Sequence, residues 1–317
     1  MINTIKNIYK FLLVIKKYFI IKDWFWAKII HERDISINEV IYNKHDNSII
    51  LKLFDYKLMK NDNLLILKTY NIAKQLNKLL GATFQPYNNN GVMFQINNNR
   101  GILKTLSDFY ILDEIFNFEV YAFDLKDNVI VWNIGANIGL ADIYFANKPN
   151  VKKIYAYEPF INNFIEAKIN YSLNPHLNSK IQISQYGISN QNKSVTLKYS
   201  PEYKGNLGII GLKEGLRVNV SNETINLLEA TNVLKQIIEN HPNEIIIAKI
   251  DCEGSEYDII QNLAQNNMLN NIHCFMIEWH DRGIEPIINY IRQFGFISIY
   301  YGVTGNSCGM IYYVKLK

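Results

Sequence analysis

Two short runs of this sequence carry residue types that could do proton chemistry on a bound small molecule. The first is Lys249-Ile-Asp-Cys-Glu-Gly-Ser-Glu256, which follows an apolar stretch and contains three carboxylates within six residues. The second is Glu278-Trp-His-Asp281, which follows another apolar stretch. Carboxylates and imidazoles move protons to and from reacting groups. The candidate catalytic residues are therefore Asp251, Glu253, Glu278 and His280.

These residues could also have structural roles, and we expect both the structural and the functional interpretation to be partly true. Asp251 could cap the helix that follows it, and Glu253 and Glu256 would favour the N-terminus of that helix. A lone histidine is more often structural than catalytic, but His280 stands near carboxylates that could orient it and raise its pKa. Cys252 is interpreted as structural, because the flanking carboxylates raise its pKa and leave the unreactive thiol.

A glycine turn indicates a second kind of site. Gly135 and Gly139 follow the apolar run Val129–Trp132 and precede a helical pattern. Glycines at such a turn let the backbone approach a ligand, and the next helix presents unpaired N–H groups. Glu158 ends the following strand, where a carboxylate can accept the hydroxyls of an adenosine ribose. The missing third glycine of the dinucleotide fingerprint favours S-adenosylmethionine over NAD, although a glycine turn without any cofactor is the structural alternative.

Strands alternating with helices must bring these residues together. Apolar runs that end just before the polar residues are separated by helix-like stretches, such as Asn162–Tyr171, and this alternation predicts a parallel α/β sheet. The predicted strands are Val129–Trp132, Ile154–Tyr157, Ile181–Ser184, Val195–Tyr199, Glu244–Ile250, Phe275–Ile277, Phe296–Ile299 and Met310–Val314. The last two, joined by the glycine-rich turn Gly302–Gly309, form a C-terminal antiparallel hairpin.

The N-terminal part reads as a separate small α+β region. Its first thirty or so residues form a basic amphipathic helix, with apolar residues such as Ile5, Ile8, Leu12, Ile15 and Phe19 on one face. We expect that helix to pack on its own domain or on a second subunit, as in a homodimer, and contact of residues 1–31 with a membrane surface is the alternative. Beyond it we predict strands at Ser48–Phe54 and Val92–Ile96, a helix at Thr69–Leu80, and turns at Asn88–Gly91 and Asn97–Gly101. The predicted domains are residues 1–100 and 101–317.

Composition excludes several classes of protein. The chain has 317 residues and is 48% hydrophobic, which rules out disorder and a coiled-coil fibre. A net charge of +4 does not call for a nucleic-acid partner. The three cysteines form no C-x-x-C pair, and the N-terminal apolar runs are interrupted by lysines. With no evident cleavable signal, we expect a cytoplasmic protein, either free or peripheral to the membrane.

The stretch from about Asn99 to Asp281 resembles the FkbM family of S-adenosylmethionine-dependent methyltransferases. The family's Asp-Ile-Gly-Ala-Asn-Ile-Gly is matched by Asn133–Gly139, its Glu-Pro by Glu158-Pro159, and its Lys-Ile-Asp-x-Glu-Gly-x-Glu by Lys249–Glu256. Its Glu-x-His is matched by Glu278 and His280, and Leu106-Ser-Asp108 resembles a Thr-Ser-Asp helix before the core. The resemblance implies a class I, Rossmann-like fold with a mostly parallel seven-stranded sheet. The cofactor-binding residues it implies are Asn133, Gly135, Asn137, Gly139, Glu158, Gly187 and Asp108.

The resemblance also implies O-methylation of a hydroxyl on a sugar, a glycan or glycolipid, or a natural product. Asp251 or His280 is then the candidate base, with Glu253 and Glu278 orienting the acceptor or the imidazole. In an alternative role, Asp251, Glu253 and Glu278 hold a divalent cation. Asn133 stands where the family has Asp, so a charge beside the cofactor's amino group is missing. The alternatives are a cofactor-binding module without activity and an NAD-linked oxidoreductase or epimerase.

Overall fold

A computed structural model describes residues 2–88, 91–200, 220–303 and 308–315. The chain divides into two compact units, Met1–Asn117 and Phe118–Lys317. The helix α5 (Leu106–Phe116) falls in the first unit, so this division comes later than the predicted boundary after residue 100. Each unit is described by itself.

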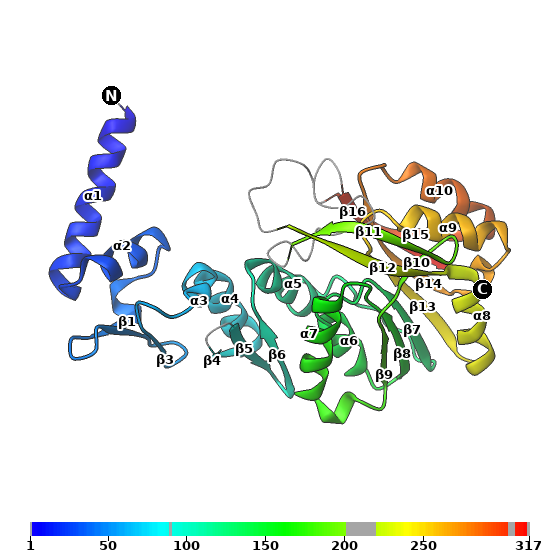
Figure 1. Cartoon of the computed structure of the whole chain (residues 1–317), viewed down its shortest axis with the longest axis horizontal. Helices are drawn as coiled ribbons and strands as arrows, with labels where there is room; N and C mark the ends of the chain where they lie inside the picture. The colour runs from blue at the N-terminus through cyan, green and yellow to red at the C-terminus, as the bar shows by residue number, and fades with distance from the viewer. Residues whose placement is uncertain (1, 89–90, 201–219, 304–307, 316–317) are drawn as a thin grey trace. The chain divides into compact units, whose positions relative to one another are not determined.

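The first unit contains helices and two small antiparallel sheets (Figure 1). The predicted N-terminal helix is two helices, because Lys22 has a positive φ and Asp23 accepts the backbone N–H of Trp26 to start a new helix. The side chains of Ile5 and Ile8 lie outside the described part. The elements are α1 (Ile2–Ile21), α2 (Trp24–Glu32), η1 (Ile37–Glu39), β1 (Val40–Asn43), β2 (Ser48–Leu51), β3 (Tyr56–Leu58), α3 (Leu65–Lys68), α4 (Tyr70–Leu80), β4 (Thr83–Tyr87), β5 (Gly91–Ile96), β6 (Asn99–Leu103) and α5.

Most of the local predictions for this unit hold. α4 ends at Gly81, whose left-handed conformation is the expected C-terminal cap. The turn predicted at 97–101 is shorter, because β6 already begins at Asn99 and pairs with β5. In the turn predicted at 88–91, residues 89 and 90 lie outside the described part.

The second unit has the predicted α/β fold, with a seven-stranded sheet in the order β15-β16-β14-β13-β7-β8-β9. Strands β9, β8, β7, β13 and β14 are parallel, and β16 runs antiparallel to both β14 and β15. This confirms the mostly parallel sheet with its terminal hairpin, in which residues 304–307 of the turn lie outside the described part. The strands are β7 (Val129–Ile134), β8 (Val151–Tyr157), β9 (Ile181–Ser184), β13 (Ile245–Ile250), β14 (Cys274–His280), β15 (Phe296–Val303) and β16 (Cys308–Lys315).

Helices cover both faces of this sheet (Figure 1). α6 and α7 lie on one side, and α8, α9 and α10 lie on the other, where they enclose a core that includes Trp132, Ala248 and Phe275. The helices are α6 (Leu140–Ala146), α7 (Ile161–Ser172), η3 (Pro175–Leu177), α8 (Ala230–Asn240), α9 (Glu256–Gln265), η5 (Leu269–Asn271), α10 (Glu285–Ile291) and η6 (Arg292–Phe294). No helix within the described ranges is long and apolar enough to cross a bilayer.

A smaller sheet contains β10 (Gly187–Ser189), β12 (Ser221–Glu229) and β11 (Lys193–Tyr199). The strand predicted at Val195–Tyr199 therefore exists but lies outside the seven-stranded sheet. β12 was not predicted, because its first half is polar and largely exposed and only the alternating Ile225 and Leu227 face the core.

The strand register fixes which residues meet at the rim of the large sheet. Asn133 on β7 is paired with Lys249 on β13, which in turn is paired with Met276 on β14. Two residues later, β7 and β13 have ended, while β14 continues to His280. Gly135, Asp251 and Glu278 therefore stand side by side.

Candidate active site

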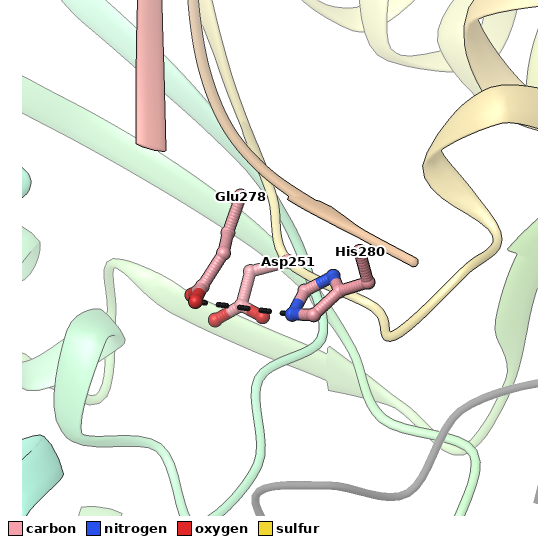
Figure 2. A group of neighbouring side chains, drawn as sticks. All are labelled: Asp251, Glu278 and His280. Carbon is pink, nitrogen blue, oxygen red and sulfur yellow. Dashed lines mark ion pairs between the residues drawn. The ribbon is translucent and has the colours of Figure 1, made fainter. Parts of the chain in front are cut away.

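The rim brings the predicted catalytic residues together. Asp251 follows β13 directly, while Glu278 and His280 project from the same face of β14 because they are two residues apart. Ligand atoms of Asp251, Glu278 and His280 all lie within 4.8 Å of one another (Figure 2). Nε2 of His280 is 3.8 Å from a Glu278 carboxylate oxygen and 3.7 Å from one of Glu253.

A fully buried carboxylate, Glu256, fixes the imidazole from the opposite side. Its Oε1 accepts the backbone N–H of His280 at 2.8 Å and lies 3.3 Å from Nδ1 of the ring. Its Oε2 accepts the backbone N–H of Gly254 at 2.7 Å. The imidazole is thus turned so that Nε2 faces the carboxylates of Glu253 and Glu278. Sequence reasoning assigned Glu256 only a helix-favouring role.

The expectation that Asp251 caps the next helix is wrong. α9 begins at Glu256 and its N-cap is Ser255, because a turn through Glu253 and Gly254, both with positive φ, separates Asp251 from the helix. The thiol of Cys252 is unreactive as predicted. Burial and the nearby charges of Glu256 and Asp251 raise its pKa well above the ordinary value.

Opposite charges set the protonation of the cluster. Burial disfavours the charged form of His280, but the hydrogen bond with Glu256 and the neighbouring carboxylates outweigh it and raise the pKa of His280 to about 10. For Asp251, burial acts in the opposite direction, yet Lys249, His280 and the hydroxyl of Tyr121 lower its pKa below the ordinary value. Burial, together with the charge of Asp251, raises the pKa of Glu253 to about 7, although His280 opposes this. At neutral pH the cluster therefore holds an imidazolium among carboxylates.

Lys249 joins this cluster to the glycine turn, a role that was not predicted from the sequence. The side chain is 3% exposed, and its Nζ donates to the carbonyl of Gly135 at 2.7 Å and lies 3.2 Å from Oδ2 of Asp251. The hydroxyl of Tyr121 donates to the same oxygen at 3.1 Å, and the Lys249 Nζ sits 5.4 Å from the Tyr121 ring centroid. A lysine inside an otherwise apolar strand was the available signal for Lys249, since a buried ammonium needs a partner. Tyr121 gave no signal.

The two glycines of the turn are required by contacts within the chain. Gly135 has φ +83°, and a Cβ there would lie 1.8 Å from the carbonyl oxygen of Asp251. Gly139 has φ +82°, and a Cβ there would lie 2.5 Å from the Tyr171 ring. The sequence argument invoked room for a ligand, whereas the structure shows backbone and ring packing at these two positions.

Glu158 holds the backbone of the same turn by hydrogen bonds. Its Oε2 accepts the backbone N–H of Asn137 at 2.8 Å, and its Oε1 accepts that of Phe160 at 3.1 Å. Burial raises the pKa of Glu158 to about 7, although these hydrogen bonds act in the opposite direction. Gly187 lies beside Pro159, and a Cβ at this position would come within 2.5 Å of Leu227. Contact of Glu158 or Gly187 with a cofactor stays a prediction.

Asn133 is paired with a carboxylate from the next helix. Its Nδ2 donates to Asp142 at 2.8 Å, and the hydroxyl of Tyr171 donates to the other Asp142 oxygen at 2.6 Å. The negative charge that the sequence lacks at position 133 is therefore present one side chain away. Burial raises the pKa of Asp142 to about 6, against the effect of these two hydrogen bonds.

The turn also leaves two buried acceptors unused. In the described chain, Oδ1 of Asn133 and Oδ1 of Asn137 have no hydrogen-bond partner. Buried polar atoms are nearly always paired, so such exceptions need an explanation. The ammonium and hydroxyl groups of S-adenosylmethionine are donors that would satisfy them. The residues present thus fit that cofactor.

Asp108 lies in the first unit and has a local structural role. Its Oδ2 accepts the backbone N–H groups of Lys104 and Thr105, and the Thr105 hydroxyl accepts the N–H of Asp108, which makes a capping box for α5. A contact of Asp108 with the cofactor stays a prediction.

Comparison with known proteins identifies similar chains. The model of the methyltransferase FkbM domain matches residues 133–298. The chain is 26% identical over 208 residues to Methyltransferase sdnD of Sordaria araneosa, covering 58% of this chain and 80% of that protein. It is 23% identical over 164 residues to Hexuronic acid methyltransferase AglP of Haloferax volcanii, covering 51% and 60%. The solved structure of methyltransferase FkbM from Methylobacillus flagellatus aligns with a TM-score of 0.41 at 13% identity, covering 78% of this chain and 59% of that one.

Proposed function

The chain belongs to the FkbM family of methyltransferases, whose methyl donor is S-adenosylmethionine, and we propose that it methylates a hydroxyl of a sugar, glycan, glycolipid or natural product. One observation carries the proposal. The glycine turn with its unused buried acceptors and the carboxylate–histidine cluster belong to adjacent strands, and Lys249 contacts both. A donor site and an acceptor site are thereby held side by side.

The cofactor's polar groups would be held by the turn. Asn133 and Asn137 offer the two buried acceptor oxygens, and Glu158 keeps the backbone of Asn137 in place. The ribose role of Glu158 belongs to this proposal, because each carboxylate oxygen has more than one lone pair to offer. When bound, S-adenosylmethionine supplies a methyl group on a sulfonium, whose C–S bond breaks as the acceptor oxygen forms the new C–O bond, with the electron pair left on sulfur.

The rim residues would position the acceptor and take its proton. A hydroxyl is a weak nucleophile until its proton is accepted as the new bond forms. We assign this task first to Asp251, whose carboxylate is held by Tyr121 and Lys249 and lies close to Glu278 and His280 (Figure 2). Glu253 and Glu278 border the same space and would accept hydrogen bonds from neighbouring hydroxyls of the acceptor.

A polyol acceptor suits these residues. Three partly exposed carboxylates, those of Asp251, Glu253 and Glu278, gather at the rim, and a carboxylate can accept two vicinal hydroxyls at once. The name of the Haloferax volcanii relative specifies a hexuronic acid. These two observations support a sugar hydroxyl as the acceptor.

Methyl transfer with site variants tests the proposal. The full chain is incubated with labelled S-adenosylmethionine and a panel of sugars, uronic acids and glycolipids, and transfer of label is measured. Asp251→Asn should leave cofactor affinity within about threefold in calorimetry and abolish transfer, while Glu239→Gln, an exposed carboxylate on α8, should change neither. Undiminished transfer by Asp251→Asn would show that the base is another residue.

Neither alternative gains support from the structure. An inactive binding module was suggested by the missing charge at Asn133, and Asp142 places a carboxylate against that residue. An NAD-linked enzyme would show a nicotinamide cofactor in the purified protein, whereas the proposal expects affinity for S-adenosylhomocysteine instead.

We extend the proposal to a peripheral membrane contact through the first unit. Val14 and Ile21 of α1 are buried, but Phe11, Leu12 and Phe19 are each more than half exposed. Residues 1–22 contain five lysines and no acidic residue. Exposed aromatic and aliphatic side chains on a cationic helix are typical of binding to anionic lipid surfaces.

Vesicle sedimentation checks the membrane contact. The chain should bind phosphatidylglycerol vesicles more strongly than phosphatidylcholine vesicles, and the double variant Phe11→Gln, Phe19→Gln should lose most of that binding. Tyr110→Gln removes a comparably exposed aromatic from α5 and serves as the control. Equal vesicle binding by the double variant would contradict the membrane contact. If the unaltered chain is a dimer and the double variant is a monomer, the exposed face of α1 is a dimer interface instead.

A further inference from the structure

Three side chains at the rim are spaced as ligands of one cation. Asp251, Glu278 and His280 each offer one ligand atom, and these atoms lie within 4.8 Å of one another. Around a cation with ligand distances of about 2.1 Å, two ligand atoms stand roughly 3 to 4.2 Å apart. The 3.8 Å between Nε2 of His280 and Oε1 of Glu278 already falls in this range. Small side-chain rotations would bring the full set to coordination distance.

His280 is oriented in the manner of a metal-binding histidine. Such residues usually offer one ring nitrogen to the metal and donate the N–H of the other to a carboxylate. Here Nδ1 faces Glu256, which two backbone N–H groups hold in place. The His280 side chain is more than nine-tenths buried, and within the described chain its Nε2 forms no hydrogen bond. That nitrogen lies 3.8 Å from the carboxylate of Glu278 (Figure 2) and 3.7 Å from that of Glu253.

The formal charges at the rim favour a cation. The carboxylates of Asp251, Glu253, Glu256 and Glu278 gather around the imidazole, and the Lys249 ammonium lies 3.2 Å from Asp251. Metal ligands must be deprotonated, so a dication bound here would displace the Nε2 proton of the His280 ring and bring one more positive charge into the carboxylate cluster. Removal of one ligand should then weaken cation binding without unfolding the sheet.

We propose that Asp251, Glu278 and His280 bind a divalent cation at the acceptor side of the rim. Two carboxylates and one imidazole suit Mn²⁺, Fe²⁺ or Zn²⁺ better than Ca²⁺, which prefers oxygen ligands alone. The role of the cation rests on the proposed methyl transfer, since a coordinated acceptor hydroxyl has a lower pKa and loses its proton more easily. The binding itself does not depend on that role.

Titration with Mn²⁺ tests the site directly. The full chain is freed of metal by a chelator and dialysis, and free Mn²⁺ is measured by electron paramagnetic resonance as it is added. We expect one saturable site per chain. Glu278→Gln and His280→Ala should each raise the Kd at least tenfold, and Glu256→Gln should weaken binding as well, by about 10- to 100-fold. Glu239→Gln is the matched control and should bind as the unaltered chain does.

Circular dichroism checks that each variant is folded. Glu278→Gln is the least disruptive change, because Glu278 lies at the open rim. Absence of saturable Mn²⁺ binding, or unchanged binding by both Glu278→Gln and His280→Ala, overturns the proposal. Cofactor binding and methyl transfer are measured in parallel with and without chelator. Undiminished transfer in chelator refutes the role of the cation alone, whereas Mn²⁺ binding without transfer to any hydroxyl refutes the proposed function and leaves the metal site standing.

Discussion

Replacing Asp142 by asparagine should make the protein less sensitive to alkaline pH. Asp142 is fully buried in α6, where one oxygen accepts from Asn133 and the other from the hydroxyl of Tyr171. Asparagine can keep both contacts, because its carbonyl accepts from Asn133 and its amide donates to the Tyr171 oxygen. The substitution therefore removes the charge while preserving the shape and the number of hydrogen bonds.

The size of the effect follows from the pKa shift. Burial raises the pKa of Asp142 from 3.8 to about 6, so the folded chain binds this proton more tightly than the unfolded chain. The contribution of this proton to the free energy of unfolding is fully present below pH 3.8, and it is lost as the pH rises through the pKa of the folded chain. Relative to its value below pH 3.8, the free energy of unfolding is then lower by about 2 kcal/mol at pH 5 and by about 3 kcal/mol at pH 8. The variant escapes this loss, so its stability relative to the unaltered chain should improve by about 1 kcal/mol between these pH values.

Urea unfolding at pH 5, 6, 7 and 8 measures this difference. The signal should report the second unit, for which hydrogen exchange of the β7 amides is suitable because that strand is central and buried. Glu239→Gln controls for the loss of one carboxylate as such. If the free-energy difference between Asp142→Asn and the unaltered chain stays constant with pH, or moves in favour of the unaltered chain as pH rises, the burial argument is wrong.

Two further substitutions test the turn itself. Gly135→Ala would place a Cβ 1.8 Å from a backbone oxygen at positive φ and should lower the free energy of unfolding by about 3–5 kcal/mol in urea. Gly81 also has positive φ but no atom within 4 Å of an added Cβ, so Gly81→Ala should lower it by only about 1–2 kcal/mol. Similar losses for both variants would refute the packing explanation. Lys249→Met leaves the Gly135 carbonyl and Asp251 without their buried partner and should cost about 3 kcal/mol or more, so a variant of unchanged stability would mean that the lysine does not join the two segments.

The strands of the large sheet and the position of its rim could be predicted because they depend on local signals. Apolar runs such as Ile245–Ile250 identify buried parallel strands, and polar residues directly after them must emerge at one edge. Asp251, Glu278 and His280 were found in this way. The same reasoning cannot see β12, whose polar alternation depends on a partner strand remote in sequence.

The network around the candidate residues was harder to predict because it is made by tertiary contacts. Tyr121 reaches Asp251 across 130 positions of sequence, and Asp142 matters only because Asn133 and Tyr171 both point at it. Asp108 makes the capping box that its spacing from Thr105 allowed, and the cofactor contact that its motif position suggested stays a prediction.

Direct contacts join the glycine turn, where we propose that the methyl donor binds, to the rim, where we propose that the acceptor binds. Gly135 packs against the carbonyl of Asp251, and Lys249 binds the Gly135 carbonyl with the same ammonium group that contacts the Asp251 carboxylate. Methyl transfer needs the acceptor oxygen within about 3–3.5 Å of the methyl carbon, so small displacements between the two sites are costly. These contacts between neighbouring strands would set that separation before any ligand binds. Loosening them should therefore lower the rate of transfer more than it lowers affinity for either ligand.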